Sequence, residues 1–556
     1  MMETPMTMGR PGRRAFLSTV ALVIAAPIVL RGTMACSAEP VTAKIKNGIL
    51  RGVRAKGALS FKGIPYAAGT AGANRFKAPQ PVADWHGERD ATEYGSLSPQ
   101  INTGMSGSVF GWYNQDEPLG EDCCVLNVFT RDLDTNAKRP VMFYIHGGGY
   151  INGGGGGAGL DGSNLARYGD VVVVTINHRL NAFGYTNLSH LDPEHFGDAA
   201  NAGNLDIVAA LEWARDNITQ FGGDPGSVTV FGQSGGGSKI MTLLAMPKAQ
   251  GLFHRAISMS GAAGLNVDPA AAMEPYVNAF IKELGVDPKN LAAAQQIPMQ
   301  TVLDARIRAV AASFEGARPV IDGKHIVARP MAPEGLAMHA KVPMLLGSTK
   351  TEASLFFQSD MRNFTLTEEQ MRVRLRTTFK IDDAKVDAIM GAYRKASPDM
   401  TPSDILVAVA SDVQFRLPLT GAAETKSGAT GQAPVYMYNF NWTIPWQNGV
   451  LGSPHAVDIP FAFGTVNEAG EMIGPGDDAM ETSMNLMSAF VNFARTGNPN
   501  NARMPDWKPY DTTTRTTMLV DATCETALDW RGDALREVAT LKIDPFNRAA
   551  LYRYEA

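Results

Sequence analysis

One stretch of the sequence, residues 228–238, carries a serine in a setting that suits nucleophilic chemistry. It reads V-T-V-F-G-Q-S-G-G-G-S, in which residues 228–231 predict a buried strand and the residues after Ser234 predict a helix. Glycines two positions before and after the serine permit a sharp turn from strand to helix, which pushes the serine hydroxyl out at the edge of a sheet. We therefore interpret Ser234 as a candidate nucleophile.

The same residues contain the glycine spacing of a phosphate-binding loop, at Gly232 and Gly237. Ser238-Lys239 follows, however, where such a loop needs lysine and then serine or threonine. No lysine is placed to reach phosphates, so we reject that interpretation.

A serine hydroxyl is a weak nucleophile unless a base takes its proton and an acid orients the base. With this strand–serine–helix turn, the acid and then the histidine follow the serine along the chain. Of the nine histidines, only His455 lies beyond the apolar segment 435–438, where the last partner is expected. The sequence therefore predicts His455 as the general base, against the alternative of a solvent-exposed loop histidine.

The acid is expected in the loop after the apolar strand 342–346, where Glu352 is the only carboxylate. Asp322 is a rival candidate, but it stands in an Asp-Gly pair, which more often forms a turn. We expect Glu352 to orient His455 and keep Asp322 as the alternative.

The glycines that follow the apolar strand 140–145 suit the stabilisation of a negative charge. Gly147, Gly148 and Gly149 can present backbone N–H groups with no side chain in the way, and Gly235 supplies another directly after the nucleophile. A phosphate or metal loop is the alternative for His146 and these glycines, but no second ligand cluster supports it. We expect no metal and no cofactor, and we interpret His146 as a side chain that braces the loop.

The elements that must position these residues alternate between strand and helix, which indicates the α/β class with a mostly parallel sheet. Helical patterns near residues 266–340 and 367–427 look like excursions from one sheet that form a cap, and 435–438 is the last clear core strand. Asn47-Gly48 predicts an early hairpin, and the region after Ser60 reads as irregular.

The amino-acid composition also narrows the classes of function that are possible. The 556 residues are 45% hydrophobic with a net charge of -5, so a large core is possible and nucleic-acid binding has no support. The sequence contains four cysteines, Cys36, Cys123, Cys124 and Cys524. Only three remain if Cys36 leaves with a signal, so we expect buried apolar thiols rather than a disulfide framework.

The first 38 residues predict an export signal. Arg13-Arg14 is followed by Phe16-Leu17 and an apolar run to Leu30, too short for a membrane-spanning helix. This resembles a twin-arginine signal, with cleavage near Ala38. We expect residues 39–556 to be one domain, periplasmic or secreted, with no membrane span. An uncleaved anchor is the alternative, and Cys36 is a poor lipoprotein site.

Over about residues 42 to 525 the chain resembles the type-B carboxylesterase/lipase family, which includes cholinesterases and bacterial p-nitrobenzyl esterases. The resemblance rests on the serine turn and on ordered motifs at Phe61 (F-K-G-I-P-Y-A), Glu121 (E-D-C), His146 (H-G-G-G-Y), Asn177 (N-H-R-L-N-A-F-G) and His455 (H-A-V-D-I-P-F-A-F-G). It implies an α/β-hydrolase fold with helical cap insertions. It also implies an acyl-enzyme mechanism with Ser234 as nucleophile, Glu352 as acid, His455 as base, and Gly148, Gly149 and Gly235 as oxyanion donors.

The chain departs from the family pattern in two informative places. The usual turn is G-E-S-A-G, whereas this chain has Gln233 and Gly235 around the serine, and the neutral Gln233 argues against cationic choline-type substrates. Ser98 stands where many relatives have a cysteine, so the early disulfide that the resemblance would imply is expected to be absent.

Three functions remain open from the sequence. An exported serine esterase on small-molecule esters, as a monomer or dimer, is favoured over a lipase with interfacial activation, and both over a non-catalytic binding protein. Aromatic residues in the segments 109–114 and 440–449 suggest bulky or aromatic ester groups, although they can also belong to the core. They are Phe110, Trp112, Trp442 and Trp446.

Overall fold

The computed structural model describes residues 39–101, 110–113, 115–541 and 551–552. Residues 39–556 form one compact unit. The expected export signal, with Arg13, Arg14 and Cys36, lies outside the described residues, so its expectations stay predictions.

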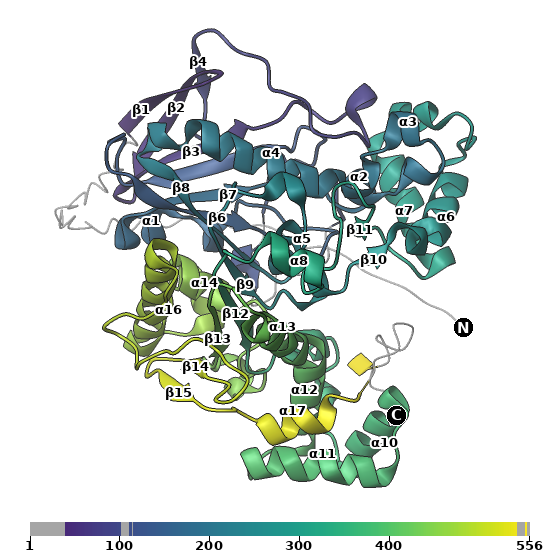
Figure 1. The fold of residues 1–556 in the computed structure, drawn as a ribbon, viewed down its shortest axis with the longest axis vertical. Coiled ribbons are helices and arrows are strands. Elements are labelled where there is room, and N and C mark those ends of the chain that lie inside the picture. Colours follow the sequence, from purple (N-terminus) through teal and green to yellow (C-terminus); the bar gives the residue numbers. More distant parts are fainter. Residues whose placement is uncertain (1–38, 102–109, 114, 542–550, 553–556) are drawn as a thin grey trace, which may run out of the picture. The chain divides into compact units, whose positions relative to one another are not determined.

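A large sheet of thirteen strands organises the described residues (Figure 1). Along the sheet the strands run β1-β2-β3-β5-β7-β6-β8-β9-β12-β13-β14-β15, and β4 pairs with β2. Their bounds are β1 Glu39–Ile45, β2 Gly48–Ala55, β3 Ala58–Pro65, β4 Glu88–Asp90, β5 Val125–Thr130, β6 Arg139–Ile145, β7 Val172–Ile176, β8 Gly223–Gln233, β9 Arg255–Met259, β12 Met344–Thr349, β13 Val435–Phe440, β14 Thr517–Val520 and β15 Glu525–Ala527.

The central strands from β7 to β14 are all parallel to one another. The pairs β1-β2, β2-β3, β3-β5 and β5-β7 are antiparallel, and so is β14-β15, whereas β4 pairs in parallel with β2. Every residue of β6, β7, β12 and β13 is buried, which explains why these strands read as continuous apolar runs rather than as alternating patterns. The mostly parallel sheet predicted from the sequence is confirmed.

Helices cover both faces of this sheet. On one face α4 (Ala202–Asn217), α5 (Gly235–Leu244) and α13 (Leu417–Gly428) share a core with Val141 and Phe143 of β6. On the other face α1 (Ser163–Gly169), α14 (Asp458–Phe463) and α16 (Asp477–Thr496) pack with Met142 and Tyr144. The alternation of β6 side chains between two cores is what a strand buried on both sides requires.

The two segments expected to be helical excursions contain most of the remaining helices. The first holds α6, α7 and α8 with the short strands β10 and β11, and the second holds α10 to α13. The bounds are α6 Glu274–Leu284, α7 Met299–Ser313, α8 Pro333–Met338, α10 Glu368–Phe379, α11 Asp383–Ala396, α12 Pro402–Ser411, β10 Asp268–Pro269 and β11 Val320–Ile321. The other helices are α2 Asn181–Tyr185, α3 Pro193–Phe196, α9 Ser354–Phe357, α15 Gly470–Ile473 and α17 Gly532–Val538.

The helical stretch 402–428 is long and apolar enough to cross a membrane by length and composition. Its most apolar window is 67% buried inside the protein, which is typical of a core helix. This is weak support for a membrane span.

Several sequence expectations need correction at the ends of the sheet. The hairpin expected at Asn47-Gly48 exists, but its register pairs Ile45 with Gly48, so the turn residues are Lys46 and Asn47. The region after Ser60 is not wholly irregular, because β3 pairs there with β2 and β5. The segment 435–438 is not the last core strand, since β14 pairs in parallel with β13. β14 is only four residues long, too short for its periodicity to be read.

Candidate active site

Ser234 lies in the sharp turn between β8 and α5, at the carboxyl edge of the parallel strands. Its φ of 57° and ψ of -120° lie in a region that a non-glycine residue rarely adopts, at a cost of about 1–3 kcal/mol. The turn is held because the Ser234 N–H donates to the carbonyl of Met259 on β9 at 2.7 Å. A methyl group at Gly236 would lie 1.9 Å from the Ile145 carbonyl oxygen, so glycine is required there.

His455 and Glu352 come together from separate loops at the same edge of the sheet. Nδ1 of His455 lies 2.5 Å from Oε2 of Glu352, and both side chains are buried. The two loops are joined directly, because the Thr351 N–H donates to the carbonyl of Ser453 at 3.1 Å. Since Nδ1 faces a carboxylate, it carries the hydrogen, and Nε2 is left as the acceptor that a general base needs.

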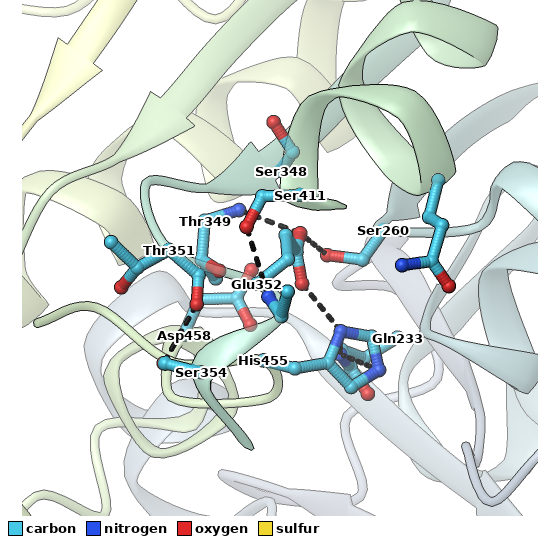
Figure 2. A network of polar contacts seen from close by, with 12 residues as sticks. Gln233, Ser260, Ser348, Thr349, Thr351, Glu352, Ser354, Ser411, His455 and Asp458 are labelled. Atoms are coloured by element: carbon cyan, nitrogen blue, oxygen red, sulfur yellow. Dashed lines mark hydrogen bonds and ion pairs between the residues drawn. The ribbon is translucent and has the colours of Figure 1, made fainter. Parts of the chain in front are cut away.

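The second oxygen of Glu352 is fixed by two further donors, as Figure 2 shows. The Ser260 hydroxyl donates to Oε1 at 2.5 Å and the Thr349 N–H donates to it at 2.8 Å. These bonds leave Oε2 directed at His455. Sequence reasoning missed Ser260, for which its position directly after the segment that forms β9 could have served as a signal.

Gln233, the residue before the serine, contacts the same imidazole. Its Nε2 lies 3.2 Å from Nε2 of His455, and the rings of Phe415 and Phe356 flank the histidine at 4.9 and 5.5 Å between centroids. The Gln233 side chain therefore lies beside the imidazole, where its neutral amide adds no charge.

Asp458 is a second carboxyl group beside the pair of Glu352 and His455. Burial, and then the negative charge of Glu352, raise the pKa of Asp458 to about 7. The Tyr438 hydroxyl donates to its Oδ2 at 3.1 Å. Asp458 is thus partly protonated near neutral pH, which limits the negative charge that accumulates around Glu352.

Ser234 and His455 line one cavity of about 520 Å³. Gly148 and Gly149 line the same cavity, and the rest of its wall is mainly apolar. The larger apolar side chains in the wall are Leu97, Ile101, Phe110, Trp112, Tyr113, Leu119, Ile151, Leu355 and Phe356. A concave apolar site with a few convergent polar groups is typical of a site for a small organic ligand.

The glycine turn after β6 can present N–H groups to this cavity. Gly148 and Gly149 have φ values of 84° and 63°, and a methyl group at Gly148 would lie 2.2 Å from Oδ1 of Asn152. Gly235 is the first residue of α5, so its N–H has no partner within the helix. A methyl group at Gly235 would lie 2.1 Å from the Gly149 carbonyl oxygen, so the glycine turn after β6 lies directly beside the turn that holds Ser234.

The rival acid Asp322 has a different role. Its Oδ1 accepts the N–H groups of Lys324, His325 and Ile326, and its Oδ2 accepts from Asn201 at 2.9 Å. Asp322 thus stabilises a turn, as its Asp-Gly sequence indicated, and lies among these partners instead of against His455.

The aromatic residues divide between cavity and core. Phe110 and Trp112 belong to the core and also line the cavity, whereas the indole N–H of Trp442 donates to the Ile473 carbonyl at 3.3 Å and the partly buried Trp446 packs against the core away from the cavity lining. The suggestion that the segment 440–449 helps form the ester pocket is therefore not supported for its two tryptophans.

Cys123, Cys124 and Cys524 are free and buried.

Known proteins include clear relatives of this chain. The profile of the Carboxylesterase family matches residues 39–533. The para-nitrobenzyl esterase of Bacillus subtilis (strain 168) is 35% identical over 485 residues, which cover 85% of this chain and 94% of that protein.

Solved structures agree with this match. A carboxylesterase from Geobacillus stearothermophilus has a TM-score of 0.77 and 31% identity, over 90% of this chain and 100% of its own. An esterase from Clostridium hathewayi, described as able to hydrolyse aliphatic aromatic polyesters, has a TM-score of 0.77 and 32% identity, over 90% of this chain and 98% of its own.

Proposed function

Because the chain belongs to the carboxylesterase family and is a carboxylic ester hydrolase with the α/β-hydrolase fold, we propose that it is an exported serine esterase with a Ser234–His455–Glu352 triad. Ser234 attacks the ester carbonyl, the alcohol leaves, and water then releases the acid from the acyl-serine. The non-catalytic alternative has no support among these relatives.

The observation that carries the proposed mechanism is the contact of 2.5 Å between Glu352 and His455, with His455 and Ser234 on the wall of one cavity. His455 takes the Ser234 proton through Nε2 and returns it to the leaving alcohol, while Glu352 stabilises the imidazolium through Nδ1. The N–H groups of Gly148, Gly149 and Gly235 bind the negative oxygen of the tetrahedral intermediate.

A fluorophosphonate reagent tests this mechanism directly. We expect one equivalent to be bound per chain, loss of esterase activity in proportion to labelling, and the adduct on the peptide that contains Ser234. Labelling of another residue with full loss of activity would contradict the assignment of Ser234.

The apolar lining of the cavity favours substrates in which the ester carries a bulky apolar or aromatic group. Ile101, Leu119, Ile151 and Phe356 are among the exposed large apolar side chains and all line this cavity. They provide apolar surface that a benzyl or longer acyl group can cover. The same residues keep a lipase as the second candidate, which would be favoured if the rate with a triglyceride rose sharply at its solubility limit.

Replacing Phe356 with alanine should raise KM for a benzyl ester by about tenfold, because burial of an aromatic group contributes about 1.5–3 kcal/mol to binding. Because Phe356 also flanks the imidazole of His455, we expect any change in kcat to be equal for benzyl and ethyl esters, whereas the rise in KM should be specific to the benzyl ester. The measurement is steady-state kinetics on matched benzyl and ethyl esters of one acid.

Phe314→Ala is the control, because Phe314 is 76% exposed and does not line the cavity. It should leave both constants unchanged. If Phe356→Ala raised KM equally for the ethyl and benzyl esters, Phe356 would not contact the alcohol group.

Export to the periplasm or medium is part of the proposal and rests on the sequence of residues 1–38. Replacing Arg13 and Arg14 together with lysine should retain the enzyme in the cytoplasm, because the twin-arginine receptor reads both guanidinium groups. Cell fractionation with an esterase assay and an immunoblot measures this. Unchanged export of the double variant would indicate the general secretory route.

A further inference from the structure

Lys239 on α5 is a buried cation with an unusual set of partners. It is fully buried, and Nζ donates to the carbonyl oxygens of Gly149 at 2.9 Å and of His146 at 3.2 Å. Across the residues that the structure describes, no carboxylate forms an ion pair with it. A buried charge without a counter-ion is costly, and burial lowers the pKa of Lys239 to about 7.

The groups around this ammonium are neutral. The stacked rings of His146 and His178 lie 4.7 Å apart, and burial, followed by the charge of Lys239, lowers both of their pKa values well below the usual range. The ring of Tyr150 lies 5.6 Å from Nζ, and burial raises the pKa of its phenol. Near neutral pH Lys239 is thus only partly charged, and its N–H donors are directed at two backbone carbonyls.

Those two carbonyls enclose the glycine turn. Because a peptide unit is planar, holding the carbonyls of His146 and Gly149 fixes the first and the last peptide plane of the turn. The two peptide planes that contain the N–H groups of Gly148 and Gly149 lie between these fixed planes. Lys239 also lies on the helix that begins directly after Ser234. One side chain therefore ties the glycine turn to the helix that carries the nucleophile.

Gly235 gives independent support for this close approach. A methyl group at residue 235 would lie 2.1 Å from the carbonyl oxygen of Gly149, the same atom that Lys239 binds. The alanine that the family pattern has at this position would push this carbonyl away. Gly235 leaves room for the turn where Lys239 holds it.

We propose that Lys239 is a positioning residue for ester hydrolysis, which holds the carbonyls of His146 and Gly149 so that the N–H groups of Gly148 and Gly149 stay aimed at the oxyanion. The inference rests on the proposed serine mechanism. Its effect is confined to the transition state, because the oxyanion forms only after attack by Ser234.

Lys239→Met removes the donors and the charge while it keeps a similar chain length. We expect kcat for a p-nitrophenyl ester to fall by about 10²- to 10³-fold, the range for loss of an oxyanion donor, with KM changed by less than about threefold. kcat is expressed per site labelled by fluorophosphonate at the end point, so unfolded protein does not contribute. Affinity for a trifluoromethyl ketone, which forms an oxyanion on Ser234, should fall in proportion to kcat/KM.

Lys426→Met is the matched control. Lys426 is also buried and bonds to the carbonyl of His339 at 3.2 Å and to Oε1 of Gln432 at 2.9 Å, but neither partner lines the cavity, whereas Gly149 does. This variant should lower Tm and leave kcat per labelled site unchanged. Loss of kcat in both lysine variants to the same extent, or trifluoromethyl ketone affinity unchanged in Lys239→Met, would overturn the proposal.

Gly235→Ala keeps the proposal testable if Lys239→Met fails to fold. It leaves the lysine in place and displaces the Gly149 carbonyl, so we expect a similar fall in kcat with little change in KM. If both single variants fold, their losses should not multiply in the double variant, because both act on one carbonyl. Full kcat in folded Gly235→Ala, or multiplied losses, would overturn the role of Lys239. Absence of esterase activity or of Ser234 labelling in the unaltered protein would instead contradict the proposed function.

Discussion

Replacing Ser234 with alanine should lower kcat for any carboxylic ester by about 10⁶-fold, the scale of loss when a catalytic nucleophile is removed. The variant keeps the glycine turn, the neighbouring imidazole and the cavity, so binding should persist and KM should change little. Steady-state kinetics with a p-nitrophenyl ester measures the loss, and fluorophosphonate labelling should disappear with it.

The backbone at residue 234 makes this variant a clean test. Alanine can adopt the strained φ of 57° about as well as serine, so we expect Tm within a few degrees of the unaltered protein. Retention of more than about a tenth of the activity by folded Ser234→Ala would rule out Ser234 as the nucleophile, since residual catalysis from the oxyanion hole alone is far smaller.

The second large effect concerns Glu352 and His455. His455→Ala should be as damaging as Ser234→Ala, because His455 is the one imidazole among the described residues that line the cavity with Ser234. Glu352→Gln should lower kcat by about 10³- to 10⁴-fold with KM little changed. The amide keeps the shape of the carboxylate, but it can present N–H to the imidazole, which favours the wrong tautomer and leaves the imidazolium unsupported.

The contacts of Glu352 explain why the amide cannot adapt. Oε1 already accepts from the Ser260 hydroxyl and the Thr349 N–H, so the glutamine oxygen is needed there and its nitrogen must face His455. Ser260→Ala should therefore lower kcat less than Glu352→Gln does, since it removes one hydrogen-bond donor and leaves the carboxylate charge beside the imidazole.

A double variant separates a shared role from independent ones. Glu352→Gln with His455→Ala should be hardly slower than His455→Ala alone, because the acid acts only through the imidazole. Multiplied losses would show that Glu352 is not the partner of His455. Asp322→Asn is the matched control, and we expect it to alter stability but not kcat, because Asp322 caps a turn.

The order and identity of the candidate catalytic residues could be predicted from the sequence because each rests on a local pattern. The strand–serine–helix turn marks Ser234 by its flanking glycines, and the apolar strands before Glu352 and His455 show which loops follow them at the same edge of a parallel sheet. Continuous apolar runs located β6, β12 and β13, since every residue of these strands is buried.

The short or irregular elements could not be predicted in this way. β3 contains a register shift between Phe61 and Ile64, and β14 has four residues, so neither shows a clear periodicity. Both are fixed by the neighbouring strands with which they pair, and that pairing joins segments that are distant in the sequence.

Only the tertiary structure decided how the candidate site is held. Ser260 binds Glu352 across 92 residues of sequence, and Lys239 binds the carbonyl of Gly149 across 90. In the sequence, Ser260 is only a serine that follows a strand, and Lys239 is only a residue that does not fit the pattern of a phosphate-binding loop. Their roles arise because β6, β8, β9 and β12 lie side by side and end at one edge, which brings loops from distant parts of the chain within hydrogen-bonding distance.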